Sequence, residues 1–220
     1  MKRIKLTGNE FIAKILQGER DFDWIELQEG FNLSGHERFE ELQAYLKKNI
    51  VSIDTSLRLE SSKLGGLNAL GIHLPYLTAK NVYLYDANLS GANLQGSYLI
   101  GANLFQISLI EANLTHSKLD NAVLINASCR EGNFSYAHLN MANFYKANLV
   151  KVDLSHSNLR GVDFEGCNLL GADLTYADIT DASFRSADLQ YTNFFNTRVY
   201  DTNFADCNFM NIKNLGSLIE

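Results

Sequence analysis

The sequence predicts an all-β solenoid, a quadrilateral β-helix of short repeats with a small α-helical cap at its N-terminus. Three observations predict it. Every fifth residue from Leu84 to Phe209 is apolar, aromatic residues recur at intervals of 20 positions, and the first 50 residues are charge-rich and helix-like. A helix repeats about every 3.6 residues and a strand about every 2.0, so a sustained period of five indicates a repeat architecture.

Composition limits the possible classes of protein. The 220 residues carry a formal net charge of −6 and are 46% hydrophobic, which suits one domain with a sizeable core. A mildly acidic chain makes direct nucleic-acid binding through a basic surface unexpected. No apolar stretch is long enough to span a membrane and none follows the first basic residues, so we expect neither a membrane partner nor a signal peptide. Three scattered cysteines without a CxxC motif indicate free thiols, and the predicted location is cytoplasmic.

Residues 1–55 are expected to form the cap, with an early coil and a helical insertion. Residues 9–17 have the pattern of a short amphipathic helix, and residues 21–27 alternate like a coil in another register. Ser34–Glu37 has the form of a capping box that opens a second helix. Such a segment would cover the open end of a stacked β-helix, where unpaired edges recruit other chains.

Residues 56–211 are expected to form the β-helix, and residues 212–220 a C-terminal tail. Two positions before each apolar centre the side chain is mostly small, and the residue between is mostly Asn or Asp. In an extended segment, residues two apart point the same way, so the small residue and the centre face inward. The next small residue comes three positions later, so the chain must bend once per unit, and glycines such as Gly91 and Gly161 occupy the bends.

Two aromatic columns set the number of sides in a coil. Both recur every 20 residues, one at the centres and one at the bends: Phe144, Phe164, Phe184 and Phe204, then His116, Tyr136, His156 and Tyr176. Stacked coils place equivalent residues about 4.8 Å apart, so each coil has four sides of five residues. We interpret the second column as a solvated ladder rather than a site, because its two histidines are two coils apart.

The units ANLSG, ANLTH, ANFYK and ADLTY resemble the pentapeptide-repeat family, and the chain is most similar to cyanobacterial-type members with an N-terminal helical cap. The resemblance implies a right-handed quadrilateral β-helix. It does not fix one function, because some members of the family protect DNA gyrase from quinolones by presenting an acidic rod that mimics DNA, whereas others have no assigned role.

Apolar residues follow the centres on two neighbouring sides, where the repeat would accept Ser or Thr. They form the candidate protein-interaction surface: Tyr85, Phe105, Ile110, Ile125, Tyr145, Val150 and Leu170. A contiguous apolar patch usually marks a contact with another molecule. Burial under the N-terminal segment and chance are the alternatives. A homodimer could use this face or the C-terminal end, where Phe204 and Phe209 are the last centres.

The C-terminal half is the acidic one. Its candidate acidic surface consists of Asp178, Asp181, Asp201 and Asp206. A solvated face is the simplest explanation, and the family resemblance makes a gyrase-binding DNA mimic of the quinolone-resistance type the alternative. Arg160, Arg185 and Arg198 interrupt the acidic pattern.

Nothing in the sequence indicates catalysis. The five histidines lack metal-binding spacing, and no nucleophile accompanies a base, so we expect no catalytic residue, cofactor or metal. The side chains of the repeat fill the interior and leave no room for a pocket. The sequence therefore predicts a non-enzymatic interaction or scaffold protein whose protein partner is unidentified.

Overall fold

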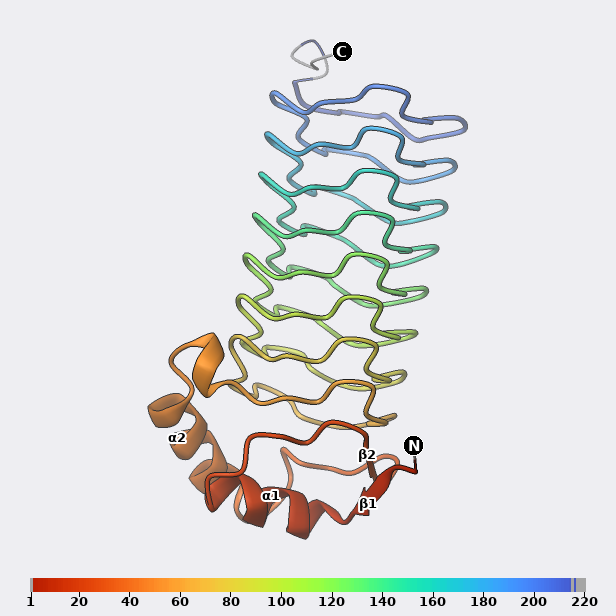
Figure 1. Ribbon diagram of the computed structural model, residues 1–220. Coiled ribbons are helices and arrows are strands. Elements are labelled where there is room, and N and C mark those ends of the chain that lie inside the picture. The colour runs from red at the N-terminus through yellow and green to blue at the C-terminus, as the bar shows by residue number, and fades with distance from the viewer. Residues whose placement is uncertain (1, 215, 217–220) are drawn as a thin grey trace.

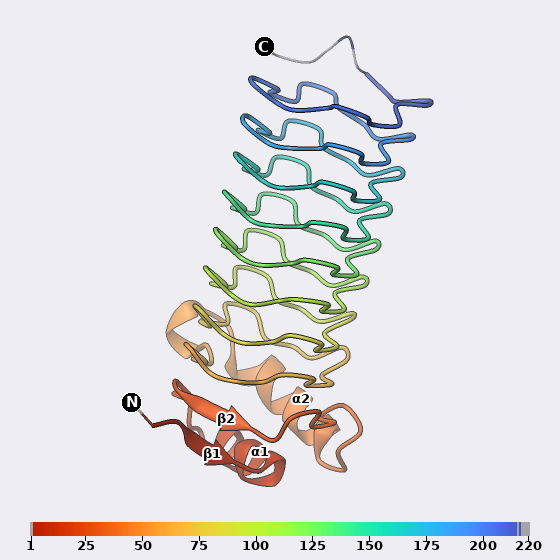
Figure 2. The ribbon, with the colours of Figure 1, turned by 90° about the vertical axis from the view of Figure 1, so that its right-hand side faces the viewer.

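The computed structural model describes residues 2–214 and 216. It is a column of stacked four-sided coils, with helices at the N-terminal end and the C-terminus at the other end (Figure 1). Turning the column by 90° shows the same regular stacking on the adjacent side (Figure 2). Among the described residues, the named helices and strands all lie between residues 4 and 55, because each side of a regular coil is too short to be a named strand.

Each side contributes one residue to a parallel ladder. Bridges join residues 20 positions apart, as in Asn93 to Asn113 and Asn113 to Asn133. The residues flanking each bridge, such as Ala92 and Leu94, are buried, whereas the bridging residue lies partly in solvent. The prediction of a β-helix with 20-residue coils is therefore confirmed. The ladder continues to Lys213, past the predicted boundary at residue 211, and the rest of the predicted tail lies mostly outside the described residues.

The Asn or Asp of each unit stabilises the bend that follows it. The Asn113 Oδ1 atom accepts a hydrogen bond from the Thr115 backbone N–H at 3.0 Å, and Asp153 does the same for Ser155 at 2.9 Å. These Asx turns hold the first bend residue, and the second takes a left-handed conformation. That conformation costs an L-residue roughly 1–2 kcal/mol. It is nevertheless adopted by His116 at φ 57° as well as by Gly91 at φ 64°.

Aromatic stacking follows the coil period. Along the interior, the ring centroid of Phe164 lies 5.3 Å from that of Phe144 and 4.8 Å from that of Phe184. Phe184 stacks in turn on Phe204 at 5.3 Å. The predicted interior ladder is confirmed, and it fills the axis of the solenoid with closely packed rings.

The N-terminal segment closes one end of the column. Strand β1 (Ile4–Leu6) pairs in parallel with β2 (Ile25–Leu27). Helix α1 (Gly8–Leu16) buries Phe11, Ile12 and Ile15, and the Phe11 ring packs on Phe22 with centroids 4.9 Å apart. Its N-terminus has a capping box that the sequence reading did not identify, in which Thr7 and Glu10 bond reciprocally.

Helix α2 (Phe39–Asn49) takes the place of one side in the first coil. Residues 21, 26 and 32 of the first coil form bridges to the coil above it. These three bridges account for three of the four sides of the first coil. On the missing side, the Gln43 amide donates to the Gly71 carbonyl and accepts from the His73 N–H. One side chain of α2 thus satisfies backbone groups that a fourth strand would otherwise pair with.

The predicted capping box at Ser34–Glu37 is wrong. Helix α2 begins at Phe39 behind Arg38, which makes no side-chain cap hydrogen bond. The Ser34 hydroxyl instead donates to the Asn68 Oδ1 atom at 3.2 Å, in the neighbouring coil. A contact between coils has replaced the local cap. A short 3₁₀ turn, η1 (Ile53–Thr55), then leads into the regular coils.

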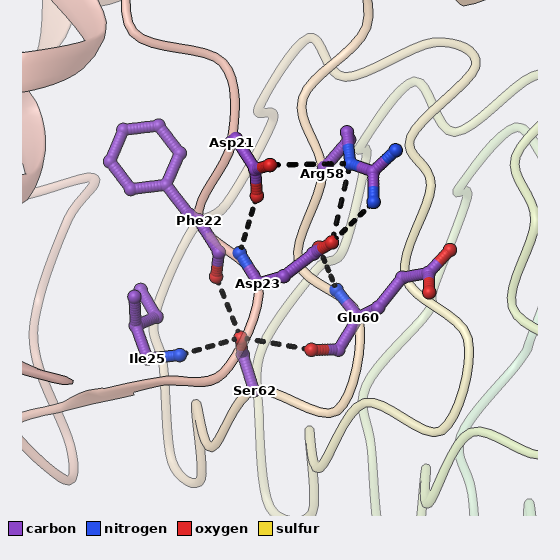
Figure 3. Close-up of polar contacts among 7 residues, drawn as sticks. All are labelled: Asp21, Phe22, Asp23, Ile25, Arg58, Glu60 and Ser62. Atoms are coloured by element: carbon purple, nitrogen blue, oxygen red, sulfur yellow. Dashed lines mark hydrogen bonds and ion pairs between the residues drawn. The ribbon is translucent and has the colours of Figure 1, made fainter. Parts of the chain in front are cut away.

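Polar side chains tie the first coil to the second (Figure 3). The fully buried Ser62 hydroxyl donates to the Phe22 carbonyl at 2.8 Å and accepts from the Ile25 N–H at 3.1 Å. Asp23 accepts from the Glu60 N–H at 2.7 Å and pairs with Arg58. These bonds connect groups about 35 to 40 residues apart, so the cap is attached by specific contacts as well as by apolar packing.

Candidate interaction surfaces

The four sides of the column are called sides 1 to 4. Their centres begin with Leu84, Leu89, Leu94 and Leu99, respectively, and each recurs every 20 residues. Each bend has two residues. The first is mostly half-buried and the second mostly exposed, because the left-handed second residue projects outward at the corner.

The structure places the candidate protein-interaction surface on two neighbouring corners. Tyr85, Phe105, Ile125 and Tyr145 are first bend residues between sides 1 and 2. The remaining members lie between sides 2 and 3: Ile110, Val150 and Leu170. All seven are half-buried and form two columns along the solenoid.

The N-terminal segment lies mainly elsewhere. Its α2 residue Gln43 contacts Gly71 and His73, at the start of side 3. Its contact with the candidate surface is at Tyr85, whose hydroxyl donates to the Glu29 Oε1 atom at 3.1 Å. That hydrogen bond, with burial and the Glu29 charge, raises the pKa of Tyr85. Figures 1 and 2 show the helices beside the lowest coils only. The helices therefore leave the upper parts of both columns of the candidate protein-interaction surface uncovered.

Several of the exposed large apolar side chains lie around side 4. Met141 is 64% exposed, and Tyr136 and Tyr176 are 48% and 51% exposed. The rings of His116, Tyr136, His156 and Tyr176 stack with centroids 5.0, 4.6 and 4.9 Å apart, so the predicted ladder at the bends is confirmed. The 20-residue period predicts this column, but the apolar pattern at the first bend residue does not reveal that the left-handed second bend residue is the more exposed one.

 A cleft lies between η1 and the lower coils, at the corner between sides 3 and 4. The cleft has a volume of about 350 Å³, and most of its lining residues are apolar or aromatic: Val51, Ser52, Ile53, Tyr76, Gly96, Tyr98 and His116. Gly96 interrupts the column of bend side chains there, so the cleft opens onto side 4.

The candidate acidic surface is partly neutralised by arginines. Asp178 pairs with Arg160 at 3.5 Å and with Arg198 at 3.3 Å, and Arg160 also pairs with Asp181 at 3.6 Å. Burial raises the pKa of Asp178, but hydrogen bonds from Thr180 and the charges of the two arginines outweigh it, so that pKa is lowered overall.

The three cysteines are free, and two of them are buried. Burial raises the pKa of the Cys129 thiol to about 12 and also raises the pKa of Cys167. Cys207 is half-buried in the last coil, and its thiol donates to the Phe184 carbonyl at 2.8 Å. Within residues 2–214 and 216, no three His, Cys, Asp or Glu side chains are grouped so that they could hold a metal ion.

We expect a thiol reagent at pH 8 to modify Cys207 in the folded protein and to leave Cys129 and Cys167 unmodified. The thiolate is the reactive form, and burial both blocks access to the two inner thiols and disfavours their ionisation. Absorbance with a chromogenic disulfide reagent should report one thiol in buffer and all three in denaturant. A Cys207→Ala variant should lose the signal in buffer, whereas fast modification of a second thiol would contradict the packing described above.

Two family models match the regular coils. The model for pentapeptide repeats in 8 copies matches residues 87–125, and the model for a pentapeptide repeat region matches residues 117–194. The chain is a pentapeptide-repeat protein. Membership implies right-handed winding of the β-helix, which is the usual hand of connections between parallel strands.

Several solved structures are similar to this pentapeptide-repeat protein. HetL, a pentapeptide repeat protein involved in heterocyst differentiation regulation in the cyanobacterium Nostoc sp. strain PCC 7120, is 21% identical, with 97% of each chain covered and a TM-score of 0.41. Rfr23 from the cyanobacterium Cyanothece 51142 is 29% identical over 67% of this chain and 97% of its own, with a TM-score of 0.31. Full-length QnrB1, a plasmid-mediated fluoroquinolone resistance protein, is 16% identical over 77% of this chain and 89% of its own, with a TM-score of 0.46.

No curated protein sequence matches the chain. Among the described residues, no helix has the length and apolar character needed to cross a membrane.

Proposed function

We propose that this pentapeptide-repeat protein is a non-enzymatic interaction or scaffold protein that binds a protein partner through the candidate protein-interaction surface. The observation that carries the proposal is the pair of apolar columns on the corners flanking side 2, which the N-terminal helices leave uncovered above Tyr85. The coils hold these side chains at a fixed spacing of about 4.8 Å, so a partner meets a preformed surface. Because the three thiols are free, we place this function in the cytoplasm.

The test is the substitution Phe105→Glu, which sets a charge in the middle of the first column. We expect it to abolish retention of a specific partner from a cell lysate, because an unpaired charge is costly to bury in an apolar contact. Gln95→Glu is the matched control, since Gln95 is the first bend residue on side 3. Both variants should keep the circular dichroism spectrum of the original protein. If the original protein retains no partner, or Phe105→Glu retains the same one, the proposal fails.

A gyrase-binding DNA mimic is the competing function. The candidate acidic surface, which would have to act as the mimic, is partly engaged in ion pairs. Arg160 and Arg198 contact Asp178, and the Arg185 Nε atom lies 3.9 Å from an Asp206 carboxylate oxygen. A mimic of DNA needs a continuous negative surface, which these arginines interrupt. We expect micromolar protein to leave gyrase supercoiling unchanged in vitro, whereas inhibition or protection from a quinolone would favour the mimic.

A further inference from the structure

Side 4 and its two corners carry a surface that the proposed partner site does not include. We call it the side 4 face. Its flat column consists of the bridging residues along the middle of side 4: Tyr98, Lys118, His138, Asn158, Asp178 and Arg198. The corner between sides 3 and 4 carries His116, Tyr136, His156 and Tyr176. The corner between sides 4 and 1 carries Met141, Arg160, Asp181 and Tyr200.

We propose that the side 4 face binds a second copy of this chain in antiparallel orientation. The two-fold axis passes between the coil that contains Tyr136 and the coil that contains His156. In a two-fold contact both copies use the same surface. In an antiparallel contact, the order of charges along one copy meets the same order reversed in the other, so the two must be complementary. The side 4 face meets that requirement.

The flat column is self-complementary in charge. With the axis in this position, Lys118 of one copy faces Asp178 of the other, and Tyr98 faces Arg198. Within one chain, the Lys118 Nζ atom lies 4.8 Å from the Tyr98 ring centroid, and the Arg198 Nη1 atom lies 3.3 Å from the Asp178 Oδ2 atom. Antiparallel docking sets the Lys118 and Tyr98 pair of one copy against the Asp178 and Arg198 pair of the other. Lys118 then meets a carboxylate and Arg198 meets an aromatic ring.

Other arrangements of the same two faces lose this match. Moving the axis by half a coil, onto Asn158, sets Lys118 against Arg198. A parallel two-fold arrangement sets Lys118 against Lys118 and Asp178 against Asp178. Like charges placed opposite each other disfavour a contact. Moving the axis the other way, onto His138, sets Lys118 against Asn158 and forms no charge pair. The charge order of the flat column therefore favours the antiparallel orientation in the register proposed.

The two corners are compatible with that register. On the corner between sides 4 and 1, Asp120 faces the coil of Asp181, whose charge is already paired with Arg160 at 3.6 Å. On the corner between sides 3 and 4, Tyr136 faces His156 and His116 faces Tyr176 of the second copy, which pairs phenol hydroxyls with imidazole nitrogens. On the other corner, the exposed Met141 side chain lies over Gly161 of its own chain, which brings its sulfur toward the axis. The methionines of the two copies therefore meet at the centre, where flexible apolar side chains pack readily.

The cleft beside η1 gives each end of the contact an apolar pocket. In this register, the coil containing Arg198 faces the coil containing Tyr98, so Phe195 of the second copy lies opposite Gly96. Phe195 is an exposed aromatic side chain, and Val51 and Ile53 are exposed on the wall of the cleft. Figure 1 shows the turn that follows α2 beside the lower coils, and residues 51–53 of that segment line the cleft. A ring entering an apolar cleft is a common anchor of an interface.

The size of the face determines the conditions of the test. Six coils spaced about 4.8 Å apart make the face about 29 Å long, and five residues make it about 16 Å wide. That is at the low end for a stable interface. We therefore expect a dimer that forms in the micromolar range and dissociates on dilution.

Light scattering and sedimentation of the full chain from about 1 to 100 μM should show a monomer passing to a dimer. Lys118→Glu should weaken the dimer at least about 10-fold, because the introduced carboxylate faces Asp178 of the second copy. Lys151→Glu is the matched control, since this exposed lysine lies on the corner between sides 2 and 3. It should leave the dimer unchanged, and both variants should keep the original circular dichroism spectrum.

Cross-linking tests the register independently of charge. Ile100→Cys and Tyr200→Cys, each in a Cys207→Ala background, place thiols that face each other across the contact, whereas like thiols stand about five coils apart, or about 24 Å. A short bis-maleimide should join the two variants when they are mixed and should join neither variant to itself. A monomer at every concentration would overturn the proposal. So would a dimer that Lys118→Glu leaves intact, or equal cross-linking in the unmixed samples, because the contact would then use another surface such as the C-terminal end.

Discussion

Replacing Phe164 with alanine is expected to lower the free energy of unfolding by about 3–5 kcal/mol, the usual cost of removing a buried ring. Phe164 is fully buried and stacks between Phe144 and Phe184, with centroids 5.3 and 4.8 Å away. The rings above and below are fixed by backbone ladders on all four sides, so they cannot close the gap. The cavity would also lie in the middle of the column, where it weakens the coupling between neighbouring coils on which a solenoid depends.

The measurement is urea denaturation followed by circular dichroism. Phe164→Leu is the matched control, because leucine already occupies the equivalent centre at Leu104 and Leu124. We expect it to cost clearly less than alanine, since most of the buried volume is kept. A loss below about 1 kcal/mol for Phe164→Ala would mean that the coils relax around the missing ring, contrary to the rigid packing inferred here.

The interior of this solenoid could be predicted from the sequence because each inward position has a fixed place in the five-residue unit. Phe144 and Phe164 stack as their 20-residue spacing predicts, and Asn93 pairs with Asn113 in the ladder. Neither result depends on distant parts of the chain. The regular bend also follows from local chemistry, because the Asn or Asp side chain bonds to the backbone two residues later.

The exterior was harder to predict because exposure at a corner depends on the coil beneath it. Tyr85 is half-buried since its ring lies over Gly65 and its hydroxyl bonds to Glu29. Met141, one position further round a bend, is far more exposed. The two kinds of position differ in backbone conformation, and the five-residue pattern of apolar residues does not reveal which of them projects outward.

The N-terminal segment was predicted in outline, but its contacts are long-range. The Ser34 hydroxyl bonds to Asn68 rather than capping α2, and Gln43 bonds to Gly71 and His73 in place of a fourth strand. Each of these partners is about 28 to 34 residues away along the chain. The Ser34 side chain therefore does not cap α2, because it makes a hydrogen bond that forms only once the coils have stacked.

Replacing Ser62 with alanine is expected to cost about 1–3 kcal/mol, because it leaves two buried backbone groups without a partner. The Ser62 hydroxyl bridges the Phe22 carbonyl and the Ile25 N–H, as Figure 3 shows. The lost bonds join the cap to the coils, so the cap should loosen before the solenoid unfolds. Trp24, the single tryptophan, lies between Phe22 and Ile25 in the sequence. Its fluorescence should therefore change at a lower urea concentration than the circular dichroism signal of the whole solenoid.

Ser117→Ala is the matched control, because Ser117 is also fully buried and occupies a position where the repeat usually has alanine. Its hydroxyl donates to the Leu114 carbonyl, but that carbonyl also accepts the Ser117 backbone N–H at 3.1 Å. Removing this hydroxyl therefore leaves no backbone group unpaired, and we expect a change below about 0.5 kcal/mol. Equal losses for the two serines would show that the junction between cap and coils does not depend on the Ser62 bridge. A loss confined to Ser62→Ala would show that the same residue type stabilises the junction through a contact between coils and is dispensable inside a regular coil.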